Sequence, residues 1–307
     1  MTEEQLVRLL AATLAMGTPV VFAALGEILA ESSGVLNLGV EGMMLVGAVA
    51  AFIVVVASGS PWLGVVAGML AAGALAAGHA LLTVTLRADQ VTAGLALALF
   101  GGGLSSFLGK AYIGVPNPAP FTPIALPGLS ALPVLGPSVF SQDALVYVSY
   151  VLIPFGWWWL YRTRPGLHLR ACGESPGTAD AMGVGVAAIR YAAVIAGGML
   201  AGLGGAYLSL AYVPAWTENL TAGLGWIALA LVIFASWDPL KLVLGAYFFG
   251  GIEAIGFRAQ VLGIQANTIV LRMLPYVATL VVMLLVALWR RRLAMPRALG
   301  LPYSREE

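Results

Sequence analysis

Side chains able to bind or catalyse are few in this chain and lie far apart. Glu41 and Asn37 fall in one apolar stretch, and Glu253 falls in another. His79 is in an apolar stretch and His168 in a polar one, and neither has a carboxylate or cysteine at the spacing of a metal or nucleophile motif. The sequence therefore predicts no catalytic residue, no metal site and no bound cofactor, and we expect no enzyme.

Glu41 is the most informative titratable residue, because a carboxyl inside an apolar span is by default a candidate functional group. Asn37 lies one helical turn before it, so we expect the two side chains to share a helix face. Two interpretations stay open. Either Glu41 faces a translocation pathway, or it is a protonated or hydrogen-bonded carboxyl that packs against a neighbouring helix.

A polar segment from Arg162 to Arg190 interrupts the apolar sequence. Its charges would cost several kcal/mol each in hydrocarbon, so the segment must lie outside a bilayer. Ser175-Pro176 is a helix start, with a hydroxyl cap and a proline at the first helical position. Gly183 and Gly185 form the matching stop. The pattern predicts a helix of about two turns, either an ordinary loop helix or an element that docks on a partner.

Composition sets the class of the protein. The 307 residues are 60% hydrophobic and 9% charged, whereas soluble domains are about 25% charged. The net charge of +1 gives no electrostatic case for nucleic acid. The single cysteine excludes an internal disulfide. We therefore expect an all-α bundle of transmembrane helices, formed by residues 1–307 as a single domain.

The apolar stretches give about eight crossings, if each needs about 20 residues. Trp237-Asp238-Pro239 breaks one stretch into two helices and leaves a first arm of about 13 residues, which is too short to cross by itself and is expected to be partly re-entrant. Gly64-x-x-x-Gly68 and Gly198-x-x-x-Gly202 predict close helix contacts. The expected spans are Leu9–Leu29, Val35–Val56, Trp62–Leu86, Val91–Leu108, Ala144–Tyr161, Tyr191–Tyr212, the broken stretch Leu224–Phe257, and Ile269–Leu288.

Basic residues set the expected orientation, because they concentrate on the cytoplasmic side. With the polar segment 162–190 inside, 11 of the 15 basic residues lie inside and four lie outside. The N-terminus is then outside, the proline-rich loop 110–142 is an outer cap without a long helix, and the C-terminus is inside. The inner residues are Arg87, Arg162, Arg164, Arg170, Arg190, Lys241, Arg290, Arg291, Arg292, Arg297 and Arg305, and the outer ones are Arg8, Lys110, Arg258 and Arg272.

Three stretches together carry a family resemblance. They are residues 26–44 (GEILAESSGVLNLGVEGMM), residues 169–184 (LRACGESPGTADAMGV) followed by Arg190-Tyr191, and residues 218–230 (ENLTAGLGWIALA) closing on Trp237-Asp238-Pro239-Leu240. The chain resembles permease subunits of ABC importers in the nucleoside and simple-sugar branch, within the superfamily that includes ribose and branched-chain amino acid permeases. The three stretches span most of the chain.

The resemblance implies a multi-pass protein of a bacterial cytoplasmic (inner) membrane that carries a nucleoside or simple sugar. It also implies an ATP-binding cassette ATPase, a second permease subunit (identical or a paralogue), an extracytoplasmic substrate-binding protein and surrounding lipid. By the same resemblance, residues 174–184 are the coupling helix that seats in the ATPase. The residues assigned to it are Glu174, Ser175, Pro176, Ala179, Met182 and Gly183.

For the translocation pathway, we expect polar residues of the second and fourth spans and aromatic residues of the short arm, where broken helices commonly meet a pathway. Packing or interface anchoring is the alternative role for each. Relatives often carry an amide where this chain has residues 94–99 (GLALAL), a departure that favours a heteromeric pore. The candidates are Asn37, Glu41, Gln90, Thr92, Trp226 and Phe234.

Other classes of function stay open at this point. A branched-chain amino acid permease would share the family resemblance. A secondary transporter or channel would work without an ATPase, and we expect it to show carboxylates at inverted-repeat positions, for which the sequence gives no convincing repeat. A structural membrane-assembly subunit would show no effect of substrate.

Overall fold

In the computed structural model, residues 3–261, 273, 277, 280, 281, 284 and 295–304 are described. Among them, seven helices are long and apolar enough to cross a membrane, as expected for a polytopic helical bundle. They are α1 (Glu3–Ser32), α2 (Val40–Ser58), α3 (Pro61–Ala80, extended by the π-helical turn Leu81–Thr85), α4 (Gln90–Gly109), α6 (Ala144–Arg162), α9 (Val186–Tyr207, extended by the π-helical turn Leu208–Tyr212) and α11 (Pro239–Val261). The expected last span, Ile269–Leu288, falls almost wholly outside the described residues.

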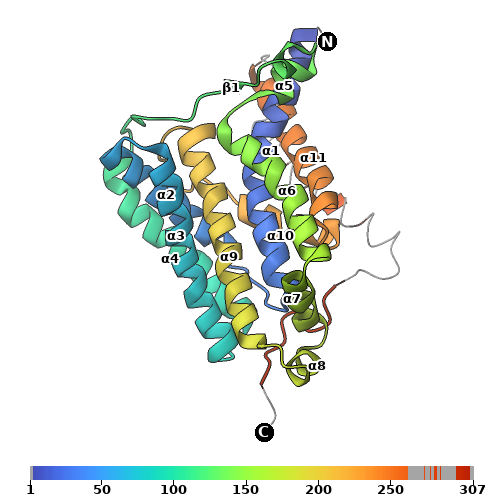
Figure 1. Cartoon of the computed structure of the whole chain (residues 1–307). Coiled ribbons are helices and arrows are strands. Elements are labelled where there is room, and N and C mark those ends of the chain that lie inside the picture. Colours follow the sequence, from blue (N-terminus) through green and yellow to red (C-terminus); the bar gives the residue numbers. More distant parts are fainter. Residues whose placement is uncertain are drawn as a thin grey trace.

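The helices pack around α1 and α9 (Figure 1). Helix α1 contacts α9 and α11, whereas α2 contacts α3, α4 and α9. The start of α1 and the C-terminal residues 295–304 lie at opposite ends of the bundle (Figure 1). The buried side chains form two large apolar clusters, one centred on α1, α9 and α10 and the other on α2 and the end of α9.

Small residues bring α3 and α9 together, as both glycine motifs predict. A Cβ atom on Gly202 would lie 2.6 Å from the carbonyl oxygen of Gly68, and one on Gly68 would lie 2.7 Å from that of Gly47 in α2. A Cβ on Gly198 would collide with Ala76. The absence of these Cβ atoms lets the backbones of α2, α3 and α9 meet at one place.

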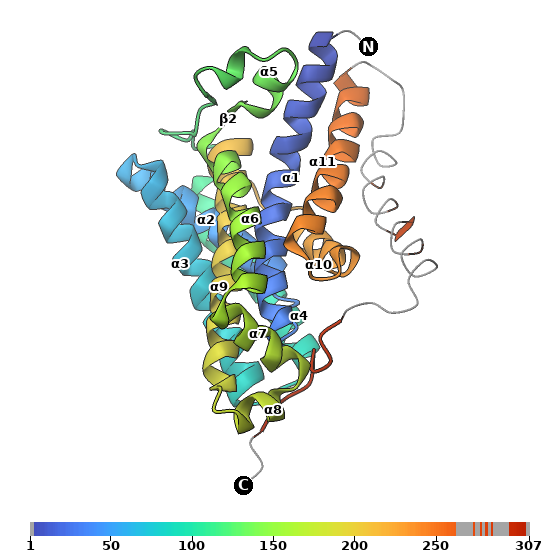
Figure 2. The ribbon, with the colours of Figure 1, turned by 45° about the vertical axis from the view of Figure 1, so that its right-hand side comes forward.

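Short elements form a cap over the end of the bundle where α1 begins (Figure 2). The described cap has no long helix, as its prolines predict. Gln142 donates a 3.4 Å hydrogen bond to the carbonyl of Ala11, which ties the cap to α1. The elements are Lys110–Tyr112 (3-10), β1 (Ile124–Ala125), Leu129–Ala131 (3-10), α5 (Leu135–Val139) and β2 (Ser141–Gln142), with β1 antiparallel to β2 in the register Ile124↔Gln142.

The short arm is α10 (Leu224–Ala235), which has 12 residues and ends where the sequence predicts. Ser236 and Trp237 have φ values of +54° and +58°, a left-handed backbone that turns the chain before Pro239 begins α11. Because 12 residues rise only about 18 Å, α10 cannot cross the bilayer.

The polar segment contains two helices rather than the single short one expected. Helix α7 (Arg164–Glu174) precedes α8 (Pro176–Ala181). Thr163 caps α7 by accepting a 3.2 Å hydrogen bond from the Gly166 amide, and Pro165 occupies its first turn. Leu169 and Cys172 are buried one helical turn apart, so α7 is held to the bundle by an apolar face that its many charges conceal in the sequence.

The predicted start and stop of α8 need one correction. The helix begins at Pro176, and Gly183 has a φ of +83°, as expected for a stop. The Ser175 hydroxyl, however, hydrogen-bonds the Thr178 hydroxyl at 2.7 Å and does not cap a backbone amide. A threonine three residues on offers the hydroxyl a competing partner.

Candidate functional site

The first of the three sequence stretches folds into a tightly held connection, the α1–α2 turn (residues 33–39). The expected second span begins at Val40 rather than at Val35, so Asn37 lies in this turn and not on the helix. The predicted shared helix face of Asn37 and Glu41 is therefore wrong. The Asn37 side chain instead accepts from the Gly39 amide at 3.1 Å and donates to Glu27 of α1 at 2.9 Å, and these bonds hold a turn conformation.

Other helices also bind the α1–α2 turn through its backbone. The Leu36 amide donates to the side-chain oxygen of Gln90 in α4 at 2.7 Å. The Leu36 carbonyl lies 3.0 Å from Nε2 of His79 in α3. Both side chains are buried, with Gln90 only 2% exposed. Both backbone groups of Leu36 are thus paired by side chains that are remote in sequence.

Glu41, at the start of α2, caps the short helix α10. Its Oε1 accepts from the Thr221 hydroxyl at 2.5 Å and from the Gly223 amide at 2.9 Å, and its Oε2 accepts from the Gly225 amide at 2.7 Å. The carboxyl lies where the first amides of α10 lack partners within the helix, and the helix dipole favours an anion there. This geometry agrees with the second interpretation of Glu41, a hydrogen-bonded carboxyl packed against a neighbouring element.

A second carboxyl holds the other end of α10. Oε2 of Glu31, on the last turn of α1, accepts a 2.6 Å hydrogen bond from the indole of Trp237. Both side chains are buried. Glu31 and Glu41 therefore bind the two ends of α10 from the two sides of the α1–α2 turn.

The remaining pathway candidates lie in different surroundings. Thr92 is exposed, and its amide and hydroxyl bond the carboxylate of Asp89, which lowers the pKa of that carboxyl below its ordinary value. Trp226 on α10 is 37% exposed. Phe234 is partly buried and packs close to Gly245 of α11. Trp226 follows Gly225, whose amide binds Glu41, whereas Thr92 and Phe234 belong to other contacts.

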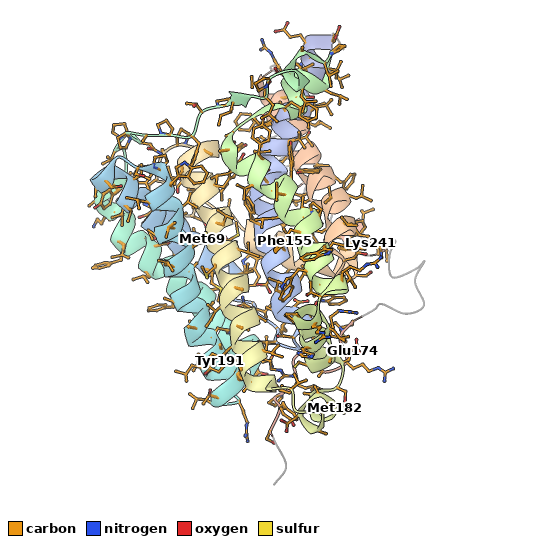
Figure 3. All side chains as sticks on the ribbon, viewed as in Figure 1. Met69, Phe155, Glu174, Met182, Tyr191 and Lys241 are labelled. Carbon is orange, nitrogen blue, oxygen red and sulfur yellow. The ribbon has the colours of Figure 1, made fainter. Side chains whose placement is uncertain are left out.

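The residues expected to dock on a partner are divided between two faces of α7 and α8. Ala179 is 4% exposed and packs with Cys172 and Val186. Met182, in contrast, is 79% exposed and lies at the tip of the knob formed by α7 and α8 (Figure 3). Glu174 is also exposed, at the end of α7, and Ser175 and Pro176 connect the two helices. The knob therefore has an inner anchor and an outer apolar tip.

One buried side chain near the knob, Arg190, was assigned no contact on the sequence. Arg190, counted there with the basic residues inside the cell, is 2% exposed and donates to the carbonyls of Ser33 at 3.1 Å and Leu301 at 3.3 Å. Residues 295–304 lie against this region. The signal available was the position of Arg190 just before an apolar run, in the second resemblance stretch.

Burial raises the pKa of the Cys172 thiol above its ordinary value, since the apolar surroundings disfavour the thiolate. Within the described ranges, no group of three or more histidine, cysteine, aspartate and glutamate side chains has the arrangement of a metal site.

Comparison with known proteins places this architecture in a family. The family described as branched-chain amino acid transport system / permease component matches residues 9–289. No solved structure matches.

Three relatives match over most of their length. A Haloferax volcanii protein named "putative glucose ABC transporter permease" is 41% identical over 97% of this chain and 98% of its own. A guanosine ABC transporter permease of Bacillus subtilis is 32% identical, with 95% of each chain covered. A nucleoside ABC transporter permease of Lactococcus lactis is 33% identical, with 94% of each chain covered. The chain therefore belongs to this ABC permease family, as a multi-pass membrane transport subunit rather than an enzyme.

Proposed function

We propose that this permease imports a nucleoside or a simple sugar, delivered by an extracytoplasmic binding protein and driven by a separate ATPase. The observation that carries the substrate class is the naming of its full-length relatives, which are permeases for glucose, guanosine and nucleosides. A branched-chain amino acid, although it appears in the family description, is the less favoured cargo. An ATP-independent transporter or channel is not favoured, because these relatives belong to ABC transporters.

The proposed topology has eight full-length crossings, with the N-terminus outside and the C-terminus in the cytoplasm, and these positions of the two termini require an odd total. Seven described helices and the expected span at 269–288 are the full-length crossings, and the segment that ends in the short helix α10 makes the additional passage, since Trp237 after α10 binds Glu31 at the end of α1 and Arg258 near the end of α11 binds Gln5 at the start of α1. The Phe121 amide donates to the carbonyl of Leu210 at 3.0 Å, so the end of α9 and the proline-rich loop share one side of the bundle. The bias of basic residues supports an outer position for that side.

The knob formed by α7 and α8 is the proposed docking site for the ATPase. An exposed methionine at the tip of a short helix suits a hydrophobic groove on a partner protein, because its thioether chain adapts to irregular surfaces. The inward-facing Ala179 supports the helix from behind. Glu174, Ser175, Pro176 and Gly183 define its ends.

The proposed pathway passes beside the starts of α2 and α4 and the short helix α10. Asn37, Glu41 and Gln90 have protein partners for their side chains, so we assign them to the positioning of its wall. Thr92 and Trp226 have exposed side chains and Phe234 is partly buried, and these three are the proposed contacts with the moving solute. A wall with so few polar contacts suits a cargo that the binding protein selects first.

A second permease subunit completes the proposed pore. Residues 94–99 of α4 offer only glycine, alanine and leucine, where relatives often carry an amide. Gly94 lies against the backbone of Leu38 in the α1–α2 turn, so this face of α4 is committed to packing. A paralogue with the polar contact is therefore the proposed partner.

The test is ATP hydrolysis and uptake by the complete complex in liposomes. Its binding protein is loaded in turn with a nucleoside, a ribose-type sugar or leucine. Hydrolysis stimulated by a nucleoside or sugar, with uptake of that compound, is the expected result. Stimulation by leucine alone would contradict the substrate class, and no stimulation by any compound in an assembled complex would contradict ATP-driven import of these substrates.

A further inference from the structure

Residues 295–304, here called the C-terminal strap, run along the end of the bundle that carries α7 and α8 (Figure 2). They contact four parts of the chain that are far apart in sequence: the α1–α2 turn, α7, α8 and the start of α9. None of the motifs recognised in the sequence lies in this strap. The contacts of the strap therefore have to be read from the structure.

The strap first joins the α1–α2 turn. The Gly300 amide donates a 3.2 Å hydrogen bond to the carbonyl of Gly34. Next to it, Arg190 of α9 donates to Ser33 of the turn and to Leu301 of the strap. One buried guanidinium therefore binds both segments, and the planar fork of arginine fixes their relative orientation.

The strap also joins the knob. The Ala298 amide donates a 2.8 Å hydrogen bond to the carbonyl of Gly173, near the end of α7. The Tyr303 hydroxyl donates a 3.1 Å hydrogen bond to Oδ2 of Asp180 in α8, and its ring packs against the cluster of Cys172, Ala179 and Val186. The Arg297–Glu174 pair, at 3.8 Å, is exposed and contributes little by itself.

Helix α8 needs such support because six residues do not form a stable helix alone. Its buried side chain is Ala179, a small anchor. Through its hydrogen bond to Asp180, Tyr303 adds a second attachment to α8. Gly300, three residues earlier in the strap, is bonded to the α1–α2 turn. From the turn, Glu31 and Glu41 reach the two ends of α10.

We propose that the C-terminal strap is a coupling element that transmits movement of α8 to the α1–α2 turn, and through the turn to α10. The inference rests on the proposed role of α8 as the ATPase-docking helix. The hydrogen bonds run without a gap from α8 to α10, and coupling through them is tested by changing one connection and measuring both ends. The strap makes the cytosolic ends of α1 and α2 respond to the ATPase together.

Gly300 offers a matched pair of variants. Its φ is +79°, and a Cβ atom added there would have no heavy atom within 4 Å, so a side chain is opposed by the backbone conformation alone. Asparagine tolerates this conformation, whereas β-branched valine does not. Gly300→Val should detach the strap from Gly34, and Gly300→Asn should keep it in place.

The functional measurement is the amount of substrate transported per ATP hydrolysed by the reconstituted complex. We expect Gly300→Val to lower this ratio by about threefold or more, within the range that residues on coupling networks contribute, and Gly300→Asn to keep the wild-type ratio. Equal ratios for the two variants would overturn the proposal. A wild-type complex without stimulated transport would instead contradict the proposed function.

A second measurement does not depend on transport. Hydrogen exchange of the intact permease in detergent reports the stability of α8 and of the α1–α2 turn. We expect faster amide exchange in both segments for Gly300→Val than for Gly300→Asn, and faster exchange in α8 alone for Tyr303→Phe, which lacks the hydroxyl that binds Asp180. Unchanged exchange in α8 and in the turn for all three variants would overturn the strap, whatever the substrate is. If Gly300→Val does not fold, Tyr303→Phe carries the test: a lower transport ratio and faster exchange in α8 are expected, and wild-type values of both would overturn the proposal.

Discussion

Single side chains of the resemblance stretches act mainly on other parts of the protein rather than on solvent. Glu41 accepts three hydrogen bonds and Glu31 accepts one, and both are buried. A buried carboxyl is costly unless hydrogen-bond donors surround it, so these residues are acceptable only with their partners in place. Loss of one donor should therefore lower the free energy of unfolding by a measurable amount.

Thr221 supplies the shortest of the bonds to Glu41 and has a matched pair of substitutions. Thr221→Val keeps the shape but removes the hydroxyl, which should lower the free energy of unfolding by about 1–3 kcal/mol. Thr221→Ser keeps the hydroxyl and should cost less. Thermal unfolding of the purified permease checks the order. A valine variant as stable as the serine variant would show that the hydroxyl is dispensable to the Glu41 cap.

Cys172 is the single cysteine of the chain and is fully buried, so it is a built-in probe of the packing between α7 and α8. Because burial raises the pKa of the thiol, the reactive thiolate is depleted at a given pH in the folded protein. Alkylation should therefore be slow near neutral pH and should accelerate only above the pH at which an exposed cysteine reacts. The measurement is the rate of maleimide or iodoacetamide labelling against pH, folded and denatured. Equal pH profiles in the two states would contradict the buried environment.

At the scale of elements, close helix packing depends on particular glycines. A Cβ on Gly101 of α4 would lie 2.6 Å from the Cα of Gly42 in α2, closer than such atoms approach in proteins, whereas a Cβ on Gly103 would have no heavy atom within 4 Å. The two glycines are two residues apart on one helix and so have the same intrinsic propensity. Their difference isolates the packing of α4 on α2.

Gly101→Ala should push α4 away from α2 and lower the thermal stability and the yield of folded permease. Gly103→Ala should be neutral or stabilising by up to about 1 kcal/mol, because alanine favours a helix over glycine. Unfolding temperature and the monodisperse fraction in detergent are the readouts. Equal tolerance of the two changes would contradict the close α2–α4 contact.

The broken helix also belongs to this scale. Helix α10 is bound at its start by Glu41 and at its end by Glu31, although it is too short to cross. Each acid belongs to a different helix flanking one turn. This arrangement makes α10 part of the α1–α2 unit rather than an independent span.

At the scale of the whole molecule, the two ends of the bundle carry different elements. One end carries the proline-rich cap, and the other carries the knob, the strap and the α1–α2 turn (Figures 1 and 2). Under the proposed coupling, force applied at the knob by an ATPase reaches the α1–α2 turn through the C-terminal strap. The exposed tip at Met182 is the point where such contact is expected.

Met182→Asp should weaken binding of the ATPase subunit by about tenfold, as expected when an apolar anchor of an interface is replaced by a charge. Met182→Leu should retain binding, because it keeps the apolar volume. Co-purification and an affinity measurement with the purified ATPase check this, with unfolding temperature as the control for folding. Normal affinity of the aspartate variant would show that α8 is not the docking element.

Much of the fold follows from the sequence alone, because a chain in lipid must satisfy its backbone within helices. Seven described helices lie where the apolar stretches predict, and the break at Trp237-Asp238-Pro239 and both glycine motifs are confirmed. The resemblance stretches likewise identified the family. Local composition was sufficient for these features, since each depends on neighbours within one helix or on the absence of a side chain.

Only the tertiary structure decided what the polar residues contact. Asn37 lies in a turn because Glu27 and the Gly39 amide bind it, and α7 forms because Leu169 and Cys172 find an apolar surface. The Thr221 hydroxyl that binds Glu41 is 180 residues away in the chain. A buried hydrogen-bonding group pairs with whichever partner the packing brings within about 3 Å, and the spacing of residues along the sequence does not identify that partner.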